Sequence, residues 1–113
     1  MKIRHGGLYL ADLNPVKGTD AGKMRPVLVI QSDLLNDVGH RSTWVLPCTT
    51  RCVGENVLRV PLPAGIAGNF VDCEAMIDQS RAIDNRRFKK ELGRTPPLVL
   101  NEVKEKLRQL ADL

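Results

Sequence analysis

Residues 27–31, with the sequence V-L-V-I-Q, constrain the fold of this chain more than any other segment. Apolar side chains follow one another there without alternation, so a strand formed by this segment is apolar on both faces. Such a strand is stable only where both of its faces are covered. We therefore expect a central, buried strand that neighbouring segments enclose.

Other apolar segments predict further strands around this one. Residues 8–13 place Leu8 and Leu10 on one face and Tyr9 and Ala11 on the other. Additional strands are expected at residues 43–48, 57–62, 70–77, 79–83 and 88–93. A helical turn is expected within residues 33–37.

The last segment of the sequence has a helical period. Its apolar residues form one stripe of a helix: Val99, Val103, Leu107 and Leu110. Thr95 is expected to be the N-cap, with Pro96 at the first helical position. Short strands followed by one helix indicate a mainly β fold, a small twisted barrel capped by the C-terminal helix.

The size of the chain suits one domain, residues 1–113. A chain of this length buries roughly two thirds of the surface that its unfolded form exposes. It therefore needs no disulfide or metal ion to hold a core. We expect Cys48, Cys52 and Cys73 to be reduced, mostly structural thiols in a reducing compartment.

The composition argues against several functional classes. No run approaches the ~18 apolar residues of a membrane span, and residues 1–7 lack the apolar segment of a secretory signal. We therefore expect a cytoplasmic protein that does not contact a membrane. No C-x-x-C pair or histidine cluster predicts a metal site, and no glycine-rich phosphate motif predicts a nucleotide cofactor.

Polar residues at two strand ends are the candidates for chemistry. Lys23 and Arg25 lie two residues apart at the end of the long connection 14–24, and a planar guanidinium binds phosphate oxygens in bidentate fashion. Arg25 could equally pair with Asp20 to close that connection. Thr49 and Thr50 leave the strand 43–48, where their hydroxyls could bind an anion or cap a turn.

A basic segment near the C-terminus also favours an anionic partner. The formal net charge of the chain is +4. Residues 81–94 contain six basic and two acidic residues, which is +4 by themselves. Such a stretch either attracts a polyanion or forms a solvated face.

Four ordered sequence blocks resemble the MazF/PemK (Kid) toxin family. They are D-L-N-P-V-K-G-T-D at residues 12–20, R-P-V-L-V-I at 25–30, V-L-P-C-T-T at 45–50 and D-Q-S-R-A-I-D at 78–84. The amphipathic C-terminal helix fits the family as well. The resemblance covers nearly the whole chain.

This resemblance implies a fold, an activity and partners. The fold would be a dimeric barrel similar to an SH3 domain, of the type shared by CcdB and MazF toxins. The activity would be sequence-specific cleavage of single-stranded RNA without a metal ion. The partners would be the RNA substrate, a second copy of the chain and a cognate antitoxin whose tail occupies the RNA groove.

The resemblance also assigns roles to individual residues. Arg25 and Thr49 match the catalytic Arg and Thr of the family. Residues of the substrate loop, the strand end and an acid–Gln pair are expected to bind RNA: Thr19, Asp20, Lys23, Thr50, Asp78 and Gln79. Three positions depart from the pattern: Asp20 replaces the usual Glu, Gly7 replaces the acid common after the first Gly, and Met76 stands where the PemK branch has Arg.

The implied chemistry is consistent with these residue types. The 2′-hydroxyl of RNA attacks the adjacent phosphate and leaves a 2′,3′-cyclic phosphate and a 5′-hydroxyl. Arg25 would stabilise the extra charge on the phosphorane, and Thr49 would donate to a phosphate oxygen. The identity of the general base is left open.

Two other functions compete with this interpretation. One is a non-catalytic toxin that resembles CcdB and binds and poisons gyrase; Arg25 with Thr49 argues against it, since a protein that only binds does not need this pair. The other is a plain RNA-binding barrel. It lacks support because the aromatic residues do not form an interleaved stacking set: Tyr9, Trp44, Phe70 and Phe88.

Overall fold

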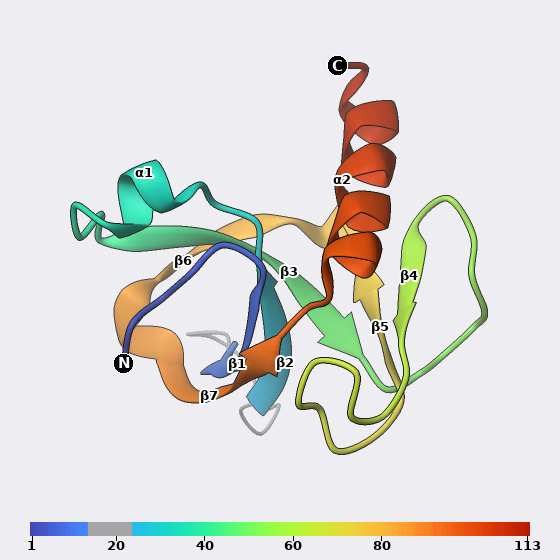
Figure 1. Ribbon diagram of the computed structural model, residues 1–113, viewed down its shortest axis with the longest axis horizontal. Helices are drawn as coiled ribbons and strands as arrows, with labels where there is room; N and C mark the ends of the chain where they lie inside the picture. The colour runs from blue at the N-terminus through green and yellow to red at the C-terminus, as the bar shows by residue number, and fades with distance from the viewer. Residues whose placement is uncertain (14–23) are drawn as a thin grey trace, which may run out of the picture.

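The computed structural model describes residues 1–13 and 24–113. Its strands are β1 (Gly7–Asp12), β2 (Met24–Val29), β3 (Ser42–Thr49), β4 (Arg59–Leu62), β5 (Cys73–Met76), β6 (Arg81–Asp84) and β7 (Phe88–Arg94). Between and after them lie the helices α1 (Asp33–Asn36) and α2 (Pro97–Ala111) and the 3₁₀ turns η1 (Ile77–Gln79) and η2 (Asn85–Arg87). Figure 1 shows their arrangement.

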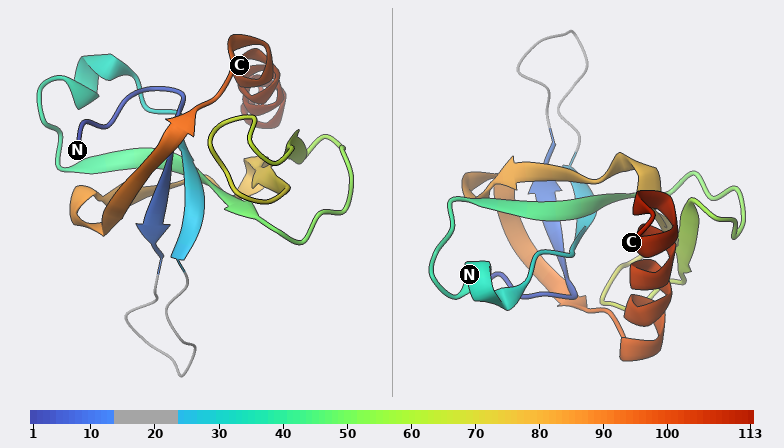
Figure 2. Two further views of the ribbon diagram at one scale, coloured as in Figure 1. Left: turned by 60° about the horizontal axis from the view of Figure 1, so that its bottom comes forward. Right: turned by 90° about the horizontal axis from the view of Figure 1, so that it is seen from above.

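The described strands form one antiparallel sheet in the order β4-β5-β3-β2-β1-β7, and β6 pairs with β3 next to β5. Strand β2 lies between β1 and β3, which confirms the central strand predicted from residues 27–31. The sheet is strongly bent, and β1 and β2 run across the direction of β3 in Figure 2. This curvature lets a small sheet cover both faces of its central strands.

Two apolar clusters lie on the two faces of β1, β2 and β3. Leu8 and Leu28 belong to one cluster, while Tyr9, Val27 and Val29 belong to the other. The first cluster includes residues of β4, β5 and α2, and the second includes residues of β6 and β7. The predicted alternation is therefore confirmed for Leu8 against Tyr9 and Ala11, while Leu10 is half-buried and belongs to neither cluster. The two clusters explain why the central strand is apolar throughout.

Helix α2 packs on the first cluster through three of its four predicted apolar positions. Val103 is fully buried, and Val99 and Leu107 pack against the cluster. Leu110 belongs to the same stripe but is 51% exposed, so the stripe is covered only over its first three positions. The reason is visible in Figure 1, where the last turns of α2 extend beyond the sheet.

The predicted start of this helix is wrong by one residue. Pro96 is the N-cap and α2 begins at Pro97, while the Thr95 side chain caps no backbone group. The Thr95 amide instead donates to the carbonyl of Gly6 at 2.8 Å. This bond continues the pairing of β1 with β7, so Thr95 belongs to the end of the sheet and the helix starts after it.

Three predicted strands begin later than expected, and the first of them is β4, which starts at Arg59 and not at residue 57. Gln79 lies in the turn η1, so β6 begins only at Arg81. Residues 70–72 belong to the loop before β5. The side-chain amide of Asn69 donates to the carbonyls of Leu62 and Val71 and holds this loop in a turn. Phe70, which follows Asn69, is consequently exposed.

Candidate functional site

A cavity of about 520 Å³ opens where β2 begins and β3 ends. Its lining residues are Met24, Arg25, Pro26, Cys48, Thr49, Thr50 and Arg51. The antiparallel register of β2 and β3 ends with Val27 opposite Pro47, and Arg25 and Thr49, each two residues beyond this pair, both line the cavity. The structure therefore brings together three residues that the sequence singled out: Arg25, Thr49 and Thr50.

Arg25 is half-buried and held by the sheet. Its backbone pairs with Ala11 of β1, so the base of its side chain has a fixed position. Within residues 1–13 and 24–113, no hydrogen bond or ion pair joins the Arg25 guanidinium to another side chain. The guanidinium is therefore available to a ligand on the side of the cavity that residues 24–26 and 48–51 form. The alternative partner, Asp20, lies outside the described residues.

Within the described residues, the Thr49 hydroxyl accepts one hydrogen bond and donates none. Thr49 is 7% exposed, and its Oγ1 accepts a hydrogen bond from the Arg51 amide at 3.1 Å. Because the oxygen is the acceptor in this bond, the hydroxyl hydrogen remains available for a ligand oxygen. The Thr49 hydroxyl can therefore cap the turn and donate to an anion at the same time.

Arg51 is a candidate that the sequence analysis missed. It lies two residues after Thr49 and lines the same cavity. With Arg25 it supplies two positive charges, and the described lining contains no acidic residue. The cavity therefore favours an anion. Its position just after the conspicuous T-T pair is the sequence signal that could have drawn attention to it.

Cys48 lines the cavity but is poorly suited to act as a nucleophile. A hydrogen bond to the Cys73 thiol, together with burial, raises the pKa of the Cys48 thiol well above its usual value. The reactive form of cysteine is the thiolate, which is then scarce at neutral pH. The chemistry of the cavity consequently depends on its guanidinium and hydroxyl groups.

The structure does not bring every predicted site residue to this cavity. Asp78 and Gln79 lie in η1, where they are exposed, and they do not line the cavity. Thr19, Asp20 and Lys23 lie outside the described residues. Their predicted roles in substrate binding stay predictions.

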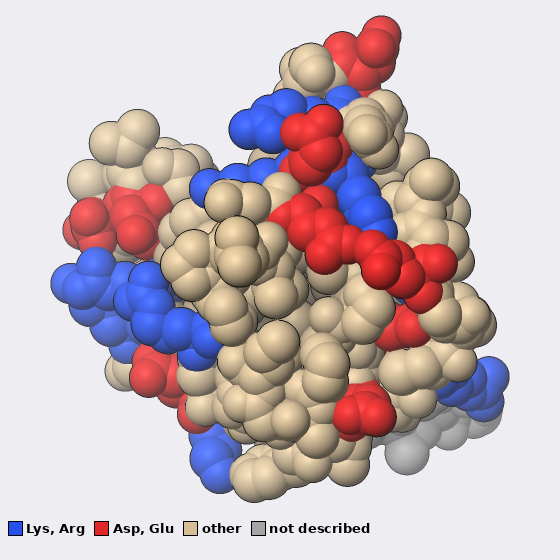
Figure 3. Space-filling view, turned by 45° about the vertical axis from the view of Figure 1, so that its right-hand side comes forward, with Lys and Arg blue, Asp and Glu red and all other residues tan. Residues whose placement is uncertain are grey.

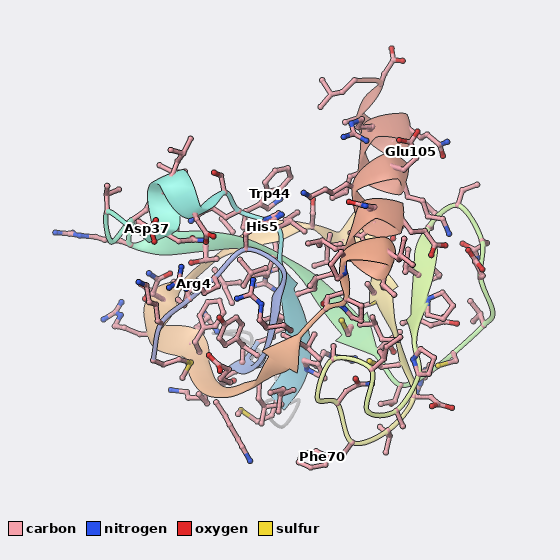
Figure 4. All side chains as sticks on the ribbon, viewed as in Figure 1. Arg4, His5, Asp37, Trp44, Phe70 and Glu105 are labelled. Carbon is pink, nitrogen blue, oxygen red and sulfur yellow. The ribbon has the colours of Figure 1, made fainter. Side chains whose placement is uncertain are left out.

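A second, apolar groove of about 430 Å³ lies between α2 and the segment around η1. Its lining residues are Trp44, Ile77, Ser80, Lys104, Leu107, Arg108, Leu110, Ala111 and Leu113. Trp44 is 45% exposed, and Figure 4 shows it on the side of β3 nearest α2. Asp78 and Gln79 lie between Ile77 and Ser80, so they adjoin this groove and not the cationic cavity.

Residues 1–13 and 24–113 contain neither a metal-binding cluster nor a membrane-spanning helix. Within 1–13 and 24–113, no group of three or more His, Cys, Asp or Glu side chains is arranged to hold a metal ion. No helix in this part of the chain combines the length and the apolar character needed to cross a membrane.

The fold and the cavity define a small β-barrel protein with a cationic cleft suited to a phosphate-bearing ligand. The chain belongs to the PemK-like, MazF-like toxins of type II toxin–antitoxin systems, because the family model matches residues 4–111. This finding confirms the resemblance seen in the sequence and the expected class of fold.

Individual relatives cover nearly the whole chain. Endoribonuclease MazF9 of Mycobacterium tuberculosis is 30% identical over 115 residues, which is 98% of this chain and 98% of the relative. Endoribonuclease EndoA of Bacillus subtilis is 32% identical over 112 residues, covering 96% and 93%.

Solved structures agree with these relatives. The crystal structure of MazF from Deinococcus radiodurans matches with a TM-score of 0.81 and 30% identity, covering 100% of this chain and 99% of that one. MazF in a MazE–MazF complex from the same organism matches with a TM-score of 0.82 and 29% identity, covering 100% and 98%.

Proposed function

We propose that this chain is an endoribonuclease toxin that cleaves single-stranded RNA at specific sequences and is neutralised by a cognate antitoxin. The observation that carries the proposal is a cavity that Arg25 and Thr49 line together, with two cations and no described acidic residue. Membership of the toxin family and the two relatives named endoribonucleases support it.

In the proposed reaction, the attacking group comes from the RNA itself. The 2′-hydroxyl attacks the adjacent phosphorus, the bond to the 5′-oxygen breaks, and the products carry a 2′,3′-cyclic phosphate and a 5′-hydroxyl. The Arg25 guanidinium donates to the phosphate oxygens and offsets the charge that develops on them. The Thr49 hydroxyl, held by the Arg51 amide, donates a further hydrogen bond.

The proposed reaction uses no metal ion. The positive charge that a phosphorane requires is supplied by Arg25, and Arg51 adds a second cation beside the same strands. We propose that Thr50 contacts the RNA next to the scissile phosphate. We propose that five further residues contact RNA nucleotides away from the scissile phosphate: Thr19, Asp20, Lys23, Asp78 and Gln79.

The proposed partners are single-stranded RNA, the antitoxin and a second copy of the chain. The MazE–MazF complex of Deinococcus radiodurans supports the antitoxin. A homodimer is supported by the apolar groove beside α2, which exposes Trp44, Leu110 and Leu113. Because single-stranded RNA is the substrate, we propose that the protein acts in the cytoplasm and contacts no membrane.

The test is RNA cleavage by the purified protein in the presence of EDTA. A mixed RNA substrate should be cut at a short common sequence, and sequencing of the new 5′ ends should locate it. An oligonucleotide with a single 2′-deoxy residue on the 5′ side of the cut should bind and resist cleavage. Cleavage that requires a divalent ion, or efficient cleavage of the deoxy substrate, would overturn the proposed chemistry.

A further inference from the structure

A buried carboxylate lies directly beside the proposed catalytic threonine. Strand β5 places Glu74 opposite Thr49 of β3 in the antiparallel register. Arg25 of β2 lines the cavity together with Thr49, and β3 lies between the strands that carry Arg25 and Glu74. Glu74 is only 2% exposed, and a buried charge is stable only when it has strong partners.

The partners of Glu74 come from the loop between β3 and β4, residues 50–58, and from Arg59 at the start of β4. One carboxylate oxygen, Oε1, accepts from the Val53 amide at 3.0 Å and from Nη1 of Arg59 at 3.0 Å. The other oxygen, Oε2, accepts from the Gly54 amide at 2.9 Å. Arg59 also donates to the carbonyl of Arg51 at 3.3 Å. The Glu74–Arg59 pair therefore binds the loop at Arg51, Val53 and Gly54.

The charge state of Glu74 fits this arrangement. Burial by itself would raise the pKa of the Glu74 carboxyl. The hydrogen bonds donated by the Val53 and Gly54 amides and by Arg59 outweigh burial and hold this pKa below its usual value. Glu74 is therefore ionised at neutral pH, and each of its bonds to the loop is charge-assisted.

The loop transmits this restraint to Thr49. The Arg51 amide donates to Oγ1 of Thr49, while the Arg51 carbonyl accepts from Arg59. Because Arg59 holds the Arg51 carbonyl, it also restrains the Arg51 amide, which orients the Thr49 hydroxyl. The same residue, Arg51, lines the cationic cavity.

The far end of the loop is anchored separately. Lys106 of α2 donates to the carbonyls of Asn56 at 2.8 Å and Arg59 at 3.0 Å, and pairs with Glu55 at 3.3 Å. Figure 3 shows the acidic and basic side chains that gather along α2 and the neighbouring loop. Because Lys106 holds the end of the loop, the loss of Glu74 would release chiefly the segment next to the cavity.

We propose that Glu74 is a positioning residue for RNA cleavage, which holds residues 51–54 so that the Thr49 hydroxyl and Arg51 meet the scissile phosphate in a fixed geometry. This inference rests on the proposed function. Glu74 is not the general base, because it does not line the cavity and both of its oxygens accept hydrogen bonds from the loop and Arg59.

The first test is Glu74→Gln, compared with Glu105→Gln as a matched control. Glu105 makes an exposed ion pair with Arg108 on α2 and contacts no residue of the cavity. Glu74→Gln should lower kcat on the order of 10- to 100-fold, since small misplacements of a catalytic group have effects of this size. Its affinity for a non-cleavable 2′-deoxy RNA should change less than about threefold, because the cations of the cavity remain.

A double-mutant cycle separates positioning from general destabilisation. In the Thr49→Ala background, Glu74→Gln should reduce the single-turnover rate clearly less than it does in the wild type, because the hydroxyl that it positions is absent and only its effect on Arg51 remains. A full, additive loss in that background would overturn the inference. Wild-type kcat in a folded Glu74→Gln protein would overturn it as well.

A second variant covers the case in which Glu74→Gln does not fold. Arg59→Gln leaves the two backbone hydrogen bonds of Glu74 in place and removes the bond to the Arg51 carbonyl. It should lower kcat by about three- to tenfold, and by less in the Thr49→Ala background, where only its effect on Arg51 remains. An unchanged kcat in Arg59→Gln would contradict the proposed route through Arg51.

Amide hydrogen exchange tests the geometry without RNA. In the wild type the amides of Arg51, Val53 and Gly54 should be protected. In Glu74→Gln or Arg59→Gln, protection should fall at Arg51 as well, although its amide bonds to Thr49 and not to Glu74. Unchanged protection at Arg51 would overturn the inference. If the wild type failed to cleave any RNA, the proposed function would fall, while the exchange data would still decide whether Glu74 orders the loop at Thr49.

Discussion

Arg25 and Thr49 illustrate how two strands place two functional groups side by side. Arg25→Ala removes a charge and a bidentate contact, and loss of one preorganised donor typically costs about 100- to 1000-fold in turnover, or about 3 kcal/mol. We expect at least this loss for Arg25→Ala, with a smaller but severe loss for Thr49→Ala. Arg25→Lys keeps the charge and loses the fork, so it should also be strongly impaired.

These variants are measured by initial cleavage rates and by RNA affinity, with circular dichroism to show that each protein is folded. Affinity should fall less than turnover because Arg51 and other bases still meet the RNA backbone. Near wild-type cleavage by Arg25→Ala would remove Arg25 from the proposed mechanism and favour a toxin that binds its target without cutting it.

Arg51 leads to a prediction about salt dependence. If Arg51 meets one phosphate, Arg51→Ala should weaken binding to single-stranded RNA and reduce the salt slope, log Kd against log salt concentration, by about 0.7. Arg41→Ala is the matched control. Arg41 is exposed and lies just before the first residue of β3, whereas Thr49 is the last residue of that strand. An equal change in slope for both variants would show that Arg51 contributes only to the overall charge.

At the scale of the element, the boundary between β7 and α2 is the most informative. The Thr95 hydroxyl is buried and has no described hydrogen-bond partner, although its residue type is typical of an N-cap. Thr95→Val should therefore leave the free energy of unfolding unchanged or raise it by up to about 1 kcal/mol, since it removes an unpaired buried hydroxyl.

Urea denaturation monitored by circular dichroism measures this effect. A capping threonine would give the opposite result, a loss of about 1 kcal/mol on substitution. Thr43→Val is the matched control, because the Thr43 hydroxyl is buried and bonds to Oδ1 of Asn85 at 2.6 Å. It should destabilise the protein by about 1–3 kcal/mol, since Asn85 loses its partner.

At the scale of the whole molecule, the prediction concerns the homodimer. Sedimentation at micromolar concentration should give about twice the chain mass of 12.5 kDa. Leu110→Glu places a charge in the apolar groove beside α2 and should shift the protein toward monomer. The control Leu98→Glu changes an exposed residue on the first turn of the same helix, outside the groove, and should leave the dimer intact.

The two substitutions also bear on function. If the RNA groove spans two copies of the chain, Leu110→Glu should lose cleavage at concentrations where it is monomeric and regain part of it at higher concentration. A monomeric Leu110→Glu protein with full cleavage activity would contradict the role of the dimer. A wild-type protein that sediments as a monomer would contradict the homodimer itself.

The sequence by itself determined the elements whose signal is local. The unbroken apolar run at residues 27–31 required coverage on both faces, and β2 is the central strand between β1 and β3. Alternation in residues 8–13 separated the two faces of β1 for the same reason. The ordered family blocks pointed to Arg25 and Thr49, which line one cavity in the structure.

Only the tertiary structure decided the features that depend on which strand lies next to which. Thr95 has the residue type of a cap, but pairing with Gly6 retains it in the sheet. Glu74 looks like an ordinary surface acid in the sequence, and Arg51 like an ordinary surface base. Glu74 lies beside Thr49 because β5 pairs with the end of β3. Arg51 is a sequence neighbour of Thr49, but its bond to Arg59 forms only because the intervening loop folds back over that end. Residues this far apart in sequence meet through long-range strand pairing, which local periodicity does not encode.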